Sequence, residues 1–156
     1  MEPISNERIT ACDWSDAGGF LEYDISYLHP ALGVLLQEYR VISTTYDGKR
    51  IYGSEFSIFG TKSDLPGSFS WMPVDVKTSL WEIIFAIKRK FFEEVKPDIV
   101  EHFIDQSYSI KQRYELYSKC LRLPDYEIEK TKHTIVFRRT PTGNGGGSLL
   151  EVMLIS

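Results

Sequence analysis

The hydrophobic period changes near the middle of the chain, and this change restricts the possible folds more than any other sequence feature. Residues 20–27 alternate apolar and polar side chains, which is the period of a half-buried strand. Residues 79–95 and 109–123 instead repeat apolar side chains every three or four positions, as amphipathic helices do. We therefore expect an α+β fold with a mixed, mostly antiparallel sheet and two main helices.

Two further strand-like runs lie in the first half of the chain, at residues 37–46 and 49–59, and they flank Asp47-Gly48. Asp-Gly in such a position indicates a hairpin, because a type I′ turn needs positive φ at both central residues. Residues 69–74 also resemble a strand, one that Pro73 would restrict to a sheet edge or a bulge.

Capping signals indicate where the two helices begin. Ser79 with Glu82, and Ser109 with Gln112, match the capping box of a helix N-terminus. Pro124 then closes the second helix, since proline cannot continue one. Three short strands complete the expected order, at residues 98–104, 126–130 and 133–139.

The strand–helix–strand passage over residues 69–104 predicts a right-handed crossover between parallel strands. Residues 1–139 are expected to form one domain, because 156 residues suit a single core. Residues 140–156 begin with a Gly-rich run that is flexible by composition. Their last eight residues, LLEVMLIS, read as a possible C-terminal strand.

Composition excludes several classes of function. A net charge of −4 argues against broad affinity for nucleic acid, which relies on a surplus of Lys and Arg. No apolar run is long enough to span a membrane. The polar N-terminus and the two cysteines, Cys12 and Cys120, predict a cytoplasmic protein without disulfides, and the three histidines show no metal-ligand spacing.

The second half of the chain resembles the C-terminal half of a GNAT-type (N-acetyltransferase) domain. The order of a long helix, a strand, a helix and two strands is shared, as are Lys96-Pro97-Asp98-Ile99-Val100 and the segment Arg113 to Tyr117 with its Leu-Tyr pair. The similarity covers roughly residues 69–139 and extends to small GNAT-like proteins of phages and mobile elements. It implies a GNAT-like fold and, for a phage-encoded protein, the bacterial host cytoplasm.

For an enzyme, the resemblance implies acetyl-CoA as cofactor and Tyr117 as the acid that protonates the leaving thiolate. The family holds the pyrophosphate on a Gly-rich turn, yet residues 72–83 contain no glycine and Asp75 adds a negative charge there. We therefore interpret the acetyl-CoA motif as degenerate and expect no cofactor. The remaining donors for phosphate would be Val76, Lys77, Thr78 and Ser79.

Most candidate catalytic residues also have a structural interpretation. Tyr117 lies on the apolar stripe of its helix, which favours a core aromatic side chain over a general acid. Cys120 reads as a buried thiol, and His102 as a partly exposed strand residue. The cluster Lys88-Arg89-Lys90 reads as the charged outer face of a helix.

The aromatic side chains of the first half suit a protein-binding surface. Tyr46 and Tyr52 flank the expected hairpin turn, where we expect both to be exposed to a partner. Our interpretation is a non-catalytic GNAT-like protein-binding module, encoded by a phage or mobile element and acting on a host or viral protein complex. Two alternatives stay open. One is an atypical acyl-CoA-dependent N-acyltransferase, and the other is a virion or assembly component that donates residues 149–155 to a neighbour as a strand.

Overall fold

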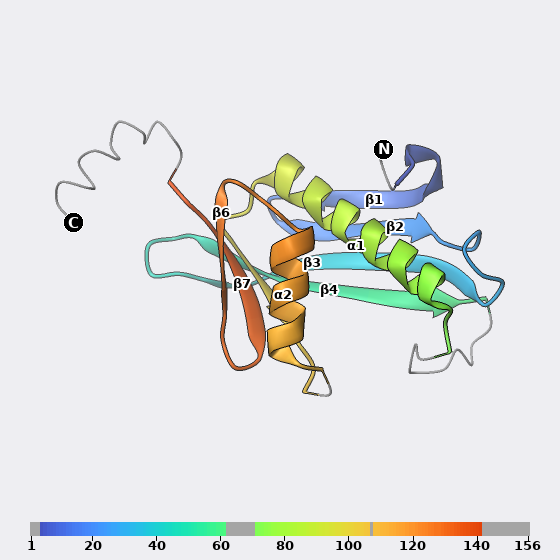
Figure 1. The fold of residues 1–156 in the computed structure, drawn as a ribbon. Helices are drawn as coiled ribbons and strands as arrows, with labels where there is room; N and C mark the ends of the chain where they lie inside the picture. The colour runs from blue at the N-terminus through green and yellow to red at the C-terminus, as the bar shows by residue number, and fades with distance from the viewer. Residues whose placement is uncertain (1–3, 62–70, 107, 142–156) are drawn as a thin grey trace.

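A computed structural model describes residues 4–61, 71–106 and 108–141. One seven-stranded sheet has the strand order β1-β2-β3-β4-β5-β7-β6 (Figure 1). Its strands are β1 (Ile9–Ser15), β2 (Gly18–Asp24), β3 (Leu32–Thr44), β4 (Arg50–Gly60), β5 (Ile99–Phe103), β6 (Tyr126–Lys130) and β7 (Thr134–Arg139). The helices are α1 (Val74–Val95) and α2 (Ile110–Cys120), with a short 3₁₀ turn, η1, at Asn6–Arg8.

The expected fold class, α+β with a mixed and mostly antiparallel sheet, is confirmed. Neighbouring strands are antiparallel except β4 and β5, which are parallel and joined through α1. Strand β1 was not expected from the sequence, because its side chains lack a clean two-residue alternation. The proposed strand at residues 149–155 and the turn at residues 64–67 lie outside the described residues.

The hairpin expected at Asp47-Gly48 joins β3 to β4, but the prediction of a type I′ turn is wrong. Gly48 has a φ of 89°, whereas Asp47 does not have positive φ. The N–H of Gly48 donates to the carbonyl of Thr45 at 2.9 Å, and the N–H of Lys49 donates to Thr45 Oγ1 at 2.9 Å. A longer loop closed by Thr45 therefore needs positive φ at the glycine alone.

Helix α1 begins earlier than expected. Its first residue is Val74 and its N-cap is Pro73, so the capping signal at Ser79 lies inside the helix. Proline suits a helix start because it has no N–H that needs a partner, and Asp75 in the first turn complements the helix dipole. The prediction of a strand at residues 69–74 is therefore wrong for residues 71–74, which are the part of this segment that the structure describes.

Helix α2 and the strands after it follow the sequence signals closely. The hydroxyl of Ser109 accepts from the N–H of Gln112 at 3.2 Å, and the helix ends at Cys120, ahead of Pro124. Strand β6 has the expected bounds, residues 126–130. These elements could be placed because their signals are local in the sequence.

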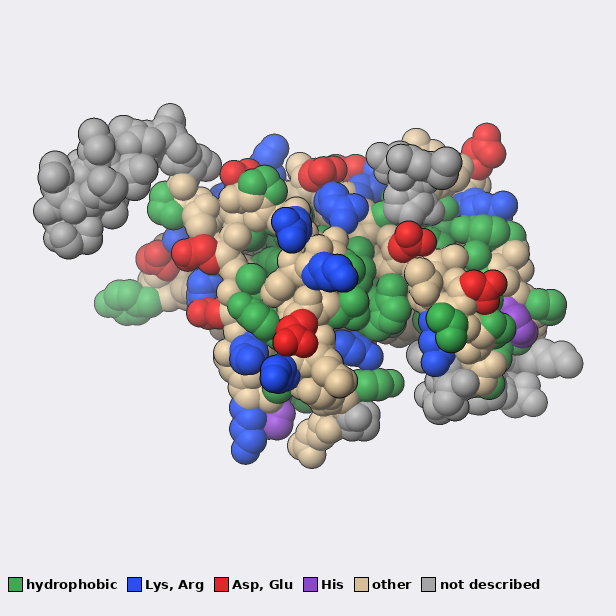
Figure 2. Space-filling model, in the orientation of Figure 1, with side chains coloured by type: hydrophobic (Ala, Val, Ile, Leu, Met, Phe, Trp, Pro, Cys, Tyr) green, Lys and Arg blue, Asp and Glu red, His purple; other side chains and the backbone are tan. Residues whose placement is uncertain are grey.

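Both helices lie on the same face of the sheet (Figure 1). Alternate side chains of β3, such as Leu35, Gln37 and Tyr39, are buried beneath α1, while their neighbours are only half-buried. Lys and Arg side chains gather over the two helices (Figure 2). Within the described part of the chain, no helix covers the opposite side, which we call the open face.

A column of aromatic rings packs under α1. The ring of Phe91 stacks on Tyr39 with centroids 3.6 Å apart, and Trp14 and Tyr52 meet it edge-on at 5.2 and 5.8 Å. Trp14 comes from the edge strand β1, so the column ties the first strand to the helix. As for membranes, none of the helices in the described ranges has the length and apolar character to cross one.

Candidate functional site

The sheet opens between its two parallel strands. Strands β4 and β5 pair from Ile51 with Ile99 as far as Ser54 with His102. Beyond this last pair β4 continues to Gly60, whereas β5 ends one residue later. A pocket lies on each face of the sheet at this opening, and Ser54 lines both.

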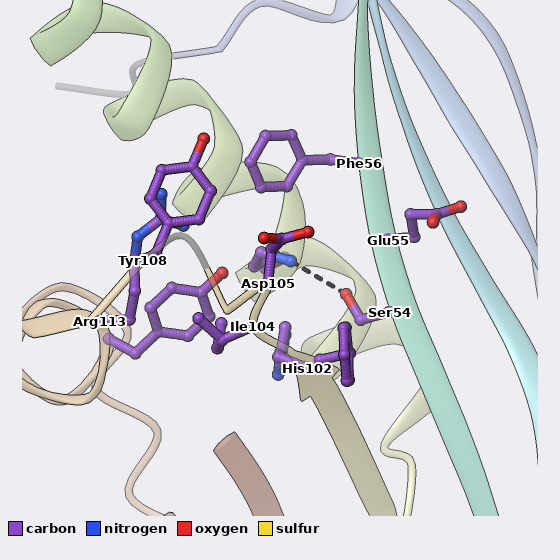
Figure 3. A pocket seen from close by; sticks show the side chains of 11 residues that line it. Ser54, Glu55, Phe56, His102, Ile104, Asp105, Tyr108 and Arg113 are labelled. Atoms are coloured by element: carbon purple, nitrogen blue, oxygen red, sulfur yellow. Dashed lines mark hydrogen bonds between the residues drawn. The ribbon is translucent and has the colours of Figure 1, made fainter. Parts of the chain in front are cut away.

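The pocket on the helix face, which we call the inner cavity, has a volume of about 200 Å³ (Figure 3). Strands β4 and β5 supply one wall, and the rest comes from the two helices and from the loop between β5 and α2. The side chains that matter for its chemistry are Ser54, Lys88, His102, Asp105, Arg113 and Tyr117.

Lys88 is the most unusual residue of the inner cavity, because it is only 1% exposed. Its Nζ donates to Gln37 Oε1 at 3.1 Å and to Ser54 Oγ at 2.9 Å, the second of which is drawn in Figure 3. The rings of Phe56 and Tyr117 lie 5.7 and 5.9 Å from the same nitrogen. Burial lowers the pKa of Lys88 from 10.5 to about 7.

The sequence interpretation of Lys88 as part of a charged outer helix face is wrong. A run of three basic residues suggests a solvated surface, yet α1 turns this one towards the sheet. One signal was present in the sequence, since Lys88 follows Ile84 by four positions and precedes Phe92 by four. Both of these neighbours are buried, so the lysine lies on the core-facing stripe itself.

His102 is also buried, at 2% exposure, and the expectation of a partly exposed residue is wrong. Its ring packs edge-on against Tyr117 and Phe137, with centroids 5.1 and 5.5 Å away. Burial, and then the charge of Lys88, hold the pKa of His102 well below its usual value. The backbone of Ile135 acts weakly in the opposite direction, without forming a hydrogen bond of normal geometry to either ring nitrogen.

Tyr117 belongs both to the core and to the wall of the inner cavity. It is buried, and its ring meets Phe85 edge-on at 5.2 Å, as expected for a core aromatic side chain. Burial raises the pKa of its hydroxyl to about 12, so the phenol stays protonated at neutral pH and remains a possible donor. The role of Tyr117 as a general acid therefore stays a prediction, for a protonated phenol that lines the cavity.

Large side chains fill the space between α1, α2 and β4. Trp81 stacks on Phe85 at 5.5 Å and meets Phe56 edge-on at 5.9 Å, and Arg113 lies over the ring of Trp81 at 4.8 Å. Pockets for drug-sized ligands measure about 300–1,000 Å³. The inner cavity is smaller than that, so it suits a small metabolite and not a molecule the size of coenzyme A.

The four residues considered as phosphate donors occupy the first turns of α1. Because the helix begins at Val74, Thr78 and Ser79 have their backbone N–H groups inside the helical ladder. The N–H of Lys77 donates to the carbonyl of Pro73 at 3.1 Å. The side chain of Val76 is buried. Of these four residues, only Val76 therefore keeps a backbone N–H outside the helical ladder, so they make a weaker anion site than the sequence suggested.

The pocket on the open face, which we call the outer depression, has a volume of about 420 Å³. Three carboxylates line it, from Glu38, Glu55 and Glu101, together with one guanidinium from Arg40. The guanidinium lies 3.9 Å from Glu38 and 4.0 Å from Glu55. Two exposed apolar side chains, Ile42 and Phe103, also line it.

The two tyrosines beside the hairpin turn have different surroundings. Tyr46 is fully exposed, with a relative accessibility of 107%, as expected. Tyr52 is only 3% exposed, so the expectation that it is exposed is wrong. Its position in β4 directs the ring towards Phe91, and its hydroxyl donates to the carbonyl of Asp16 at 2.5 Å. Of these two tyrosines, only Tyr46 is exposed to a partner.

Among the described residues, the two cysteines and the metal-ligating side chains add no site to these two pockets. Cys12 is an exposed residue. The partial burial of its thiol raises the pKa of that group, and the charges of Glu94 and Asp13 add to this effect, whereas the charge of Lys90 opposes it. Cys120 is half-buried. Within residues 4–61, 71–106 and 108–141, no group of three or more His, Cys, Asp or Glu side chains could hold a metal ion.

Fold and site define an α+β protein whose sheet carries two pockets at the opening between its parallel strands. Comparison with protein-family models and with curated proteins finds no match to this chain.

Proposed function

We propose that the chain is a non-catalytic protein-binding module with a GNAT-like fold, and that it binds its partner through the outer depression. The observation that carries the proposal is the open face itself. Three carboxylates and two exposed apolar side chains meet there, on a side of the sheet that no helix covers within the described residues. Exposed apolar groups beside charges are typical of protein interfaces.

The GNAT-like assignment is supported by the order of elements. Helix α1, strand β5, helix α2 and strands β6 and β7 follow one another as the resemblance implies. The Leu-Tyr pair, Leu116-Tyr117, lies on α2, and Tyr117 faces the opening between the parallel strands. The missing glycines and the early start of α1 favour the non-catalytic form of the fold.

The charge of the outer depression indicates what kind of partner would bind. Glu38, Glu55 and Glu101 outnumber Arg40, whereas Lys and Arg gather on the helix side (Figure 2). A basic segment with apolar side chains complements such a surface, because complementary charges guide association and apolar contacts hold the complex. Tyr46, at the tip of the neighbouring hairpin, would provide an additional contact.

Reversing one charge in the outer depression should weaken this binding. We expect Glu101→Lys to reduce the affinity for a short peptide of alternating Arg and Leu by about tenfold, equivalent to about 1.4 kcal/mol. The separate variant Phe103→Ala should also weaken the binding of this peptide, because the exposed ring and its apolar contact would be lost. The affinity can be measured by fluorescence anisotropy of the labelled peptide at fixed salt concentration.

A matched control distinguishes the depression from the overall charge of the protein. Glu115 is an exposed residue on α2, on the other side of the sheet, and Glu115→Lys changes the net charge by the same amount. It should leave the affinity nearly unchanged. An equal loss in both variants would indicate non-specific attraction and would contradict the proposed surface.

One observation favours a second candidate, an atypical acyl-CoA-dependent N-acyltransferase. Tyr117, a protonated phenol, lines a cavity at the opening of the sheet, where an acid would be needed. Such an enzyme should lose acetyl-CoA affinity with Lys77→Ala and turnover with Tyr117→Phe. A binding module should keep its peptide affinity in both variants, since neither residue lines the outer depression.

A further inference from the structure

The inner cavity is lined by both a buried primary amine and a guanidinium. Nζ of Lys88 and the guanidinium of Arg113 line the same cavity of about 200 Å³. The guanidinium is held between two aromatic rings, 4.3 Å from the centroid of Tyr108 and 4.8 Å from that of Trp81. Tyr108 is also exposed, so it connects the cavity to the surface.

The contacts of Lys88 suit a nucleophile. Two neutral groups, Gln37 Oε1 and Ser54 Oγ, accept hydrogen bonds from its Nζ, and they can use the two N–H groups of an uncharged amine. The fourth tetrahedral direction of the nitrogen then holds the lone pair. Lysines become nucleophilic when desolvation keeps them neutral, and they attack carbonyl groups to form Schiff bases.

We propose that Lys88 forms an imine with a small 2-oxo acid that enters the inner cavity, and that Arg113 binds the carboxylate of this acid. The planar guanidinium matches a carboxylate with two parallel hydrogen bonds. Buried His102 lines the same wall, and neither of its ring nitrogens has a hydrogen bond of normal geometry among the described residues. The small volume restricts the ligand to a short chain. This inference does not depend on the partner proposed for the outer depression.

The chemical step is a condensation. The lone pair of Lys88 Nζ attacks the carbonyl carbon, and a carbon–nitrogen bond forms while the carbonyl oxygen takes up a proton. The carbinolamine then loses this oxygen as water, with both amine hydrogens ending in the water molecule, and a carbon–nitrogen double bond remains. The lowered pKa of Lys88 supports the step, because a pKa of about 7 leaves much of the amine uncharged at neutral pH.

The test is reductive trapping of the full chain with pyruvate at neutral pH. Cyanoborohydride supplies a hydride that converts the imine to a stable amine, and intact-mass spectrometry with peptide mapping locates the adduct. We expect one adduct, on Lys88, that is absent from Lys88→Met. Lys90→Arg is the matched control on the same helix and should be labelled as well as the unchanged protein.

The variant Arg113→Gln separates binding of the carboxylate by Arg113 from formation of the imine by Lys88. It should slow labelling by pyruvate at least severalfold and leave labelling by acetaldehyde, which has no carboxylate, unchanged. Adducts spread over surface lysines with Lys88 unmodified would overturn the proposal. So would an undiminished adduct in Lys88→Met. If that variant fails to fold, the peptide map of the unchanged protein decides alone.

Discussion

Phe91→Ala is expected to lower the free energy of unfolding by about 3–5 kcal/mol, as removal of a fully buried ring does. Phe91 is completely buried and lies at the centre of the aromatic column beneath α1. It stacks on Tyr39 and meets Trp14 and Tyr52 edge-on, so one truncation removes contacts with β1, β3 and β4 together. The cavity that remains cannot close easily, because strands hold the surrounding rings in place.

Urea unfolding followed by tryptophan fluorescence measures this loss, since Trp14 reports on the column directly. Phe103→Ala is the matched control. Its ring is 68% exposed, so the same substitution should change stability by no more than about 0.5 kcal/mol. Similar losses in the two variants would show that Phe91 does not have the central packing role assigned to it.

Stability is expected to rise with pH in two stages, because the fold holds two basic groups uncharged. Below a pH of about 6.5, the usual pKa of histidine, His102 becomes protonated in the unfolded chain but stays neutral in the folded chain. Stability therefore falls as the pH drops below this value. Between pH 7 and about 10.5 the same reasoning applies to Lys88, whose pKa falls from 10.5 to about 7. At 1.36 kcal/mol per pKa unit, the lysine accounts for at most roughly 5 kcal/mol.

Urea midpoints across this pH range measure both stages. Lys88→Met should flatten the upper stage, since a thioether fills the same space without titrating. It should reduce the lower stage only in part, because burial is the main cause of the lowered pKa of His102 and the charge of Lys88 is the second. Lys90→Met removes a neighbouring lysine that is ion-paired with Glu94, and it should preserve the upper stage. The assignment fails if the upper stage has the same slope in Lys88→Met as in the unchanged protein.

Elements with local signals could be predicted from the sequence. Ser109 marks the start of α2, Gly48 marks the hairpin, and Pro124 follows the end of α2, because each acts on the backbone within a few residues of itself. Tyr117 could likewise be placed on a buried stripe, since the spacing of apolar residues reveals the core-facing side of a helix.

The site could not be predicted to the same extent, because it depends on packing between distant segments. Lys88 meets Gln37 and Ser54, which come from two other strands. The burial of Tyr52 depends on its register in β4 and on the turn at Asp16. The opening between β4 and β5 arises because β4 continues beyond Ser54 to Gly60, whereas β5 ends one residue after the partner of Ser54. No local pattern encodes this difference in length.

We propose that this α+β chain binds a protein and not an acyl-coenzyme A. Titration of acetyl-CoA into the full chain by calorimetry, with the melting temperature followed in parallel, tests it most directly. Trp81 and Phe85 fill the space beside the inner cavity, so we predict no heat of binding and no melting shift up to millimolar acetyl-CoA. Binding at micromolar concentration, with a rise in melting temperature by mass action, would contradict the claim and favour the acyltransferase.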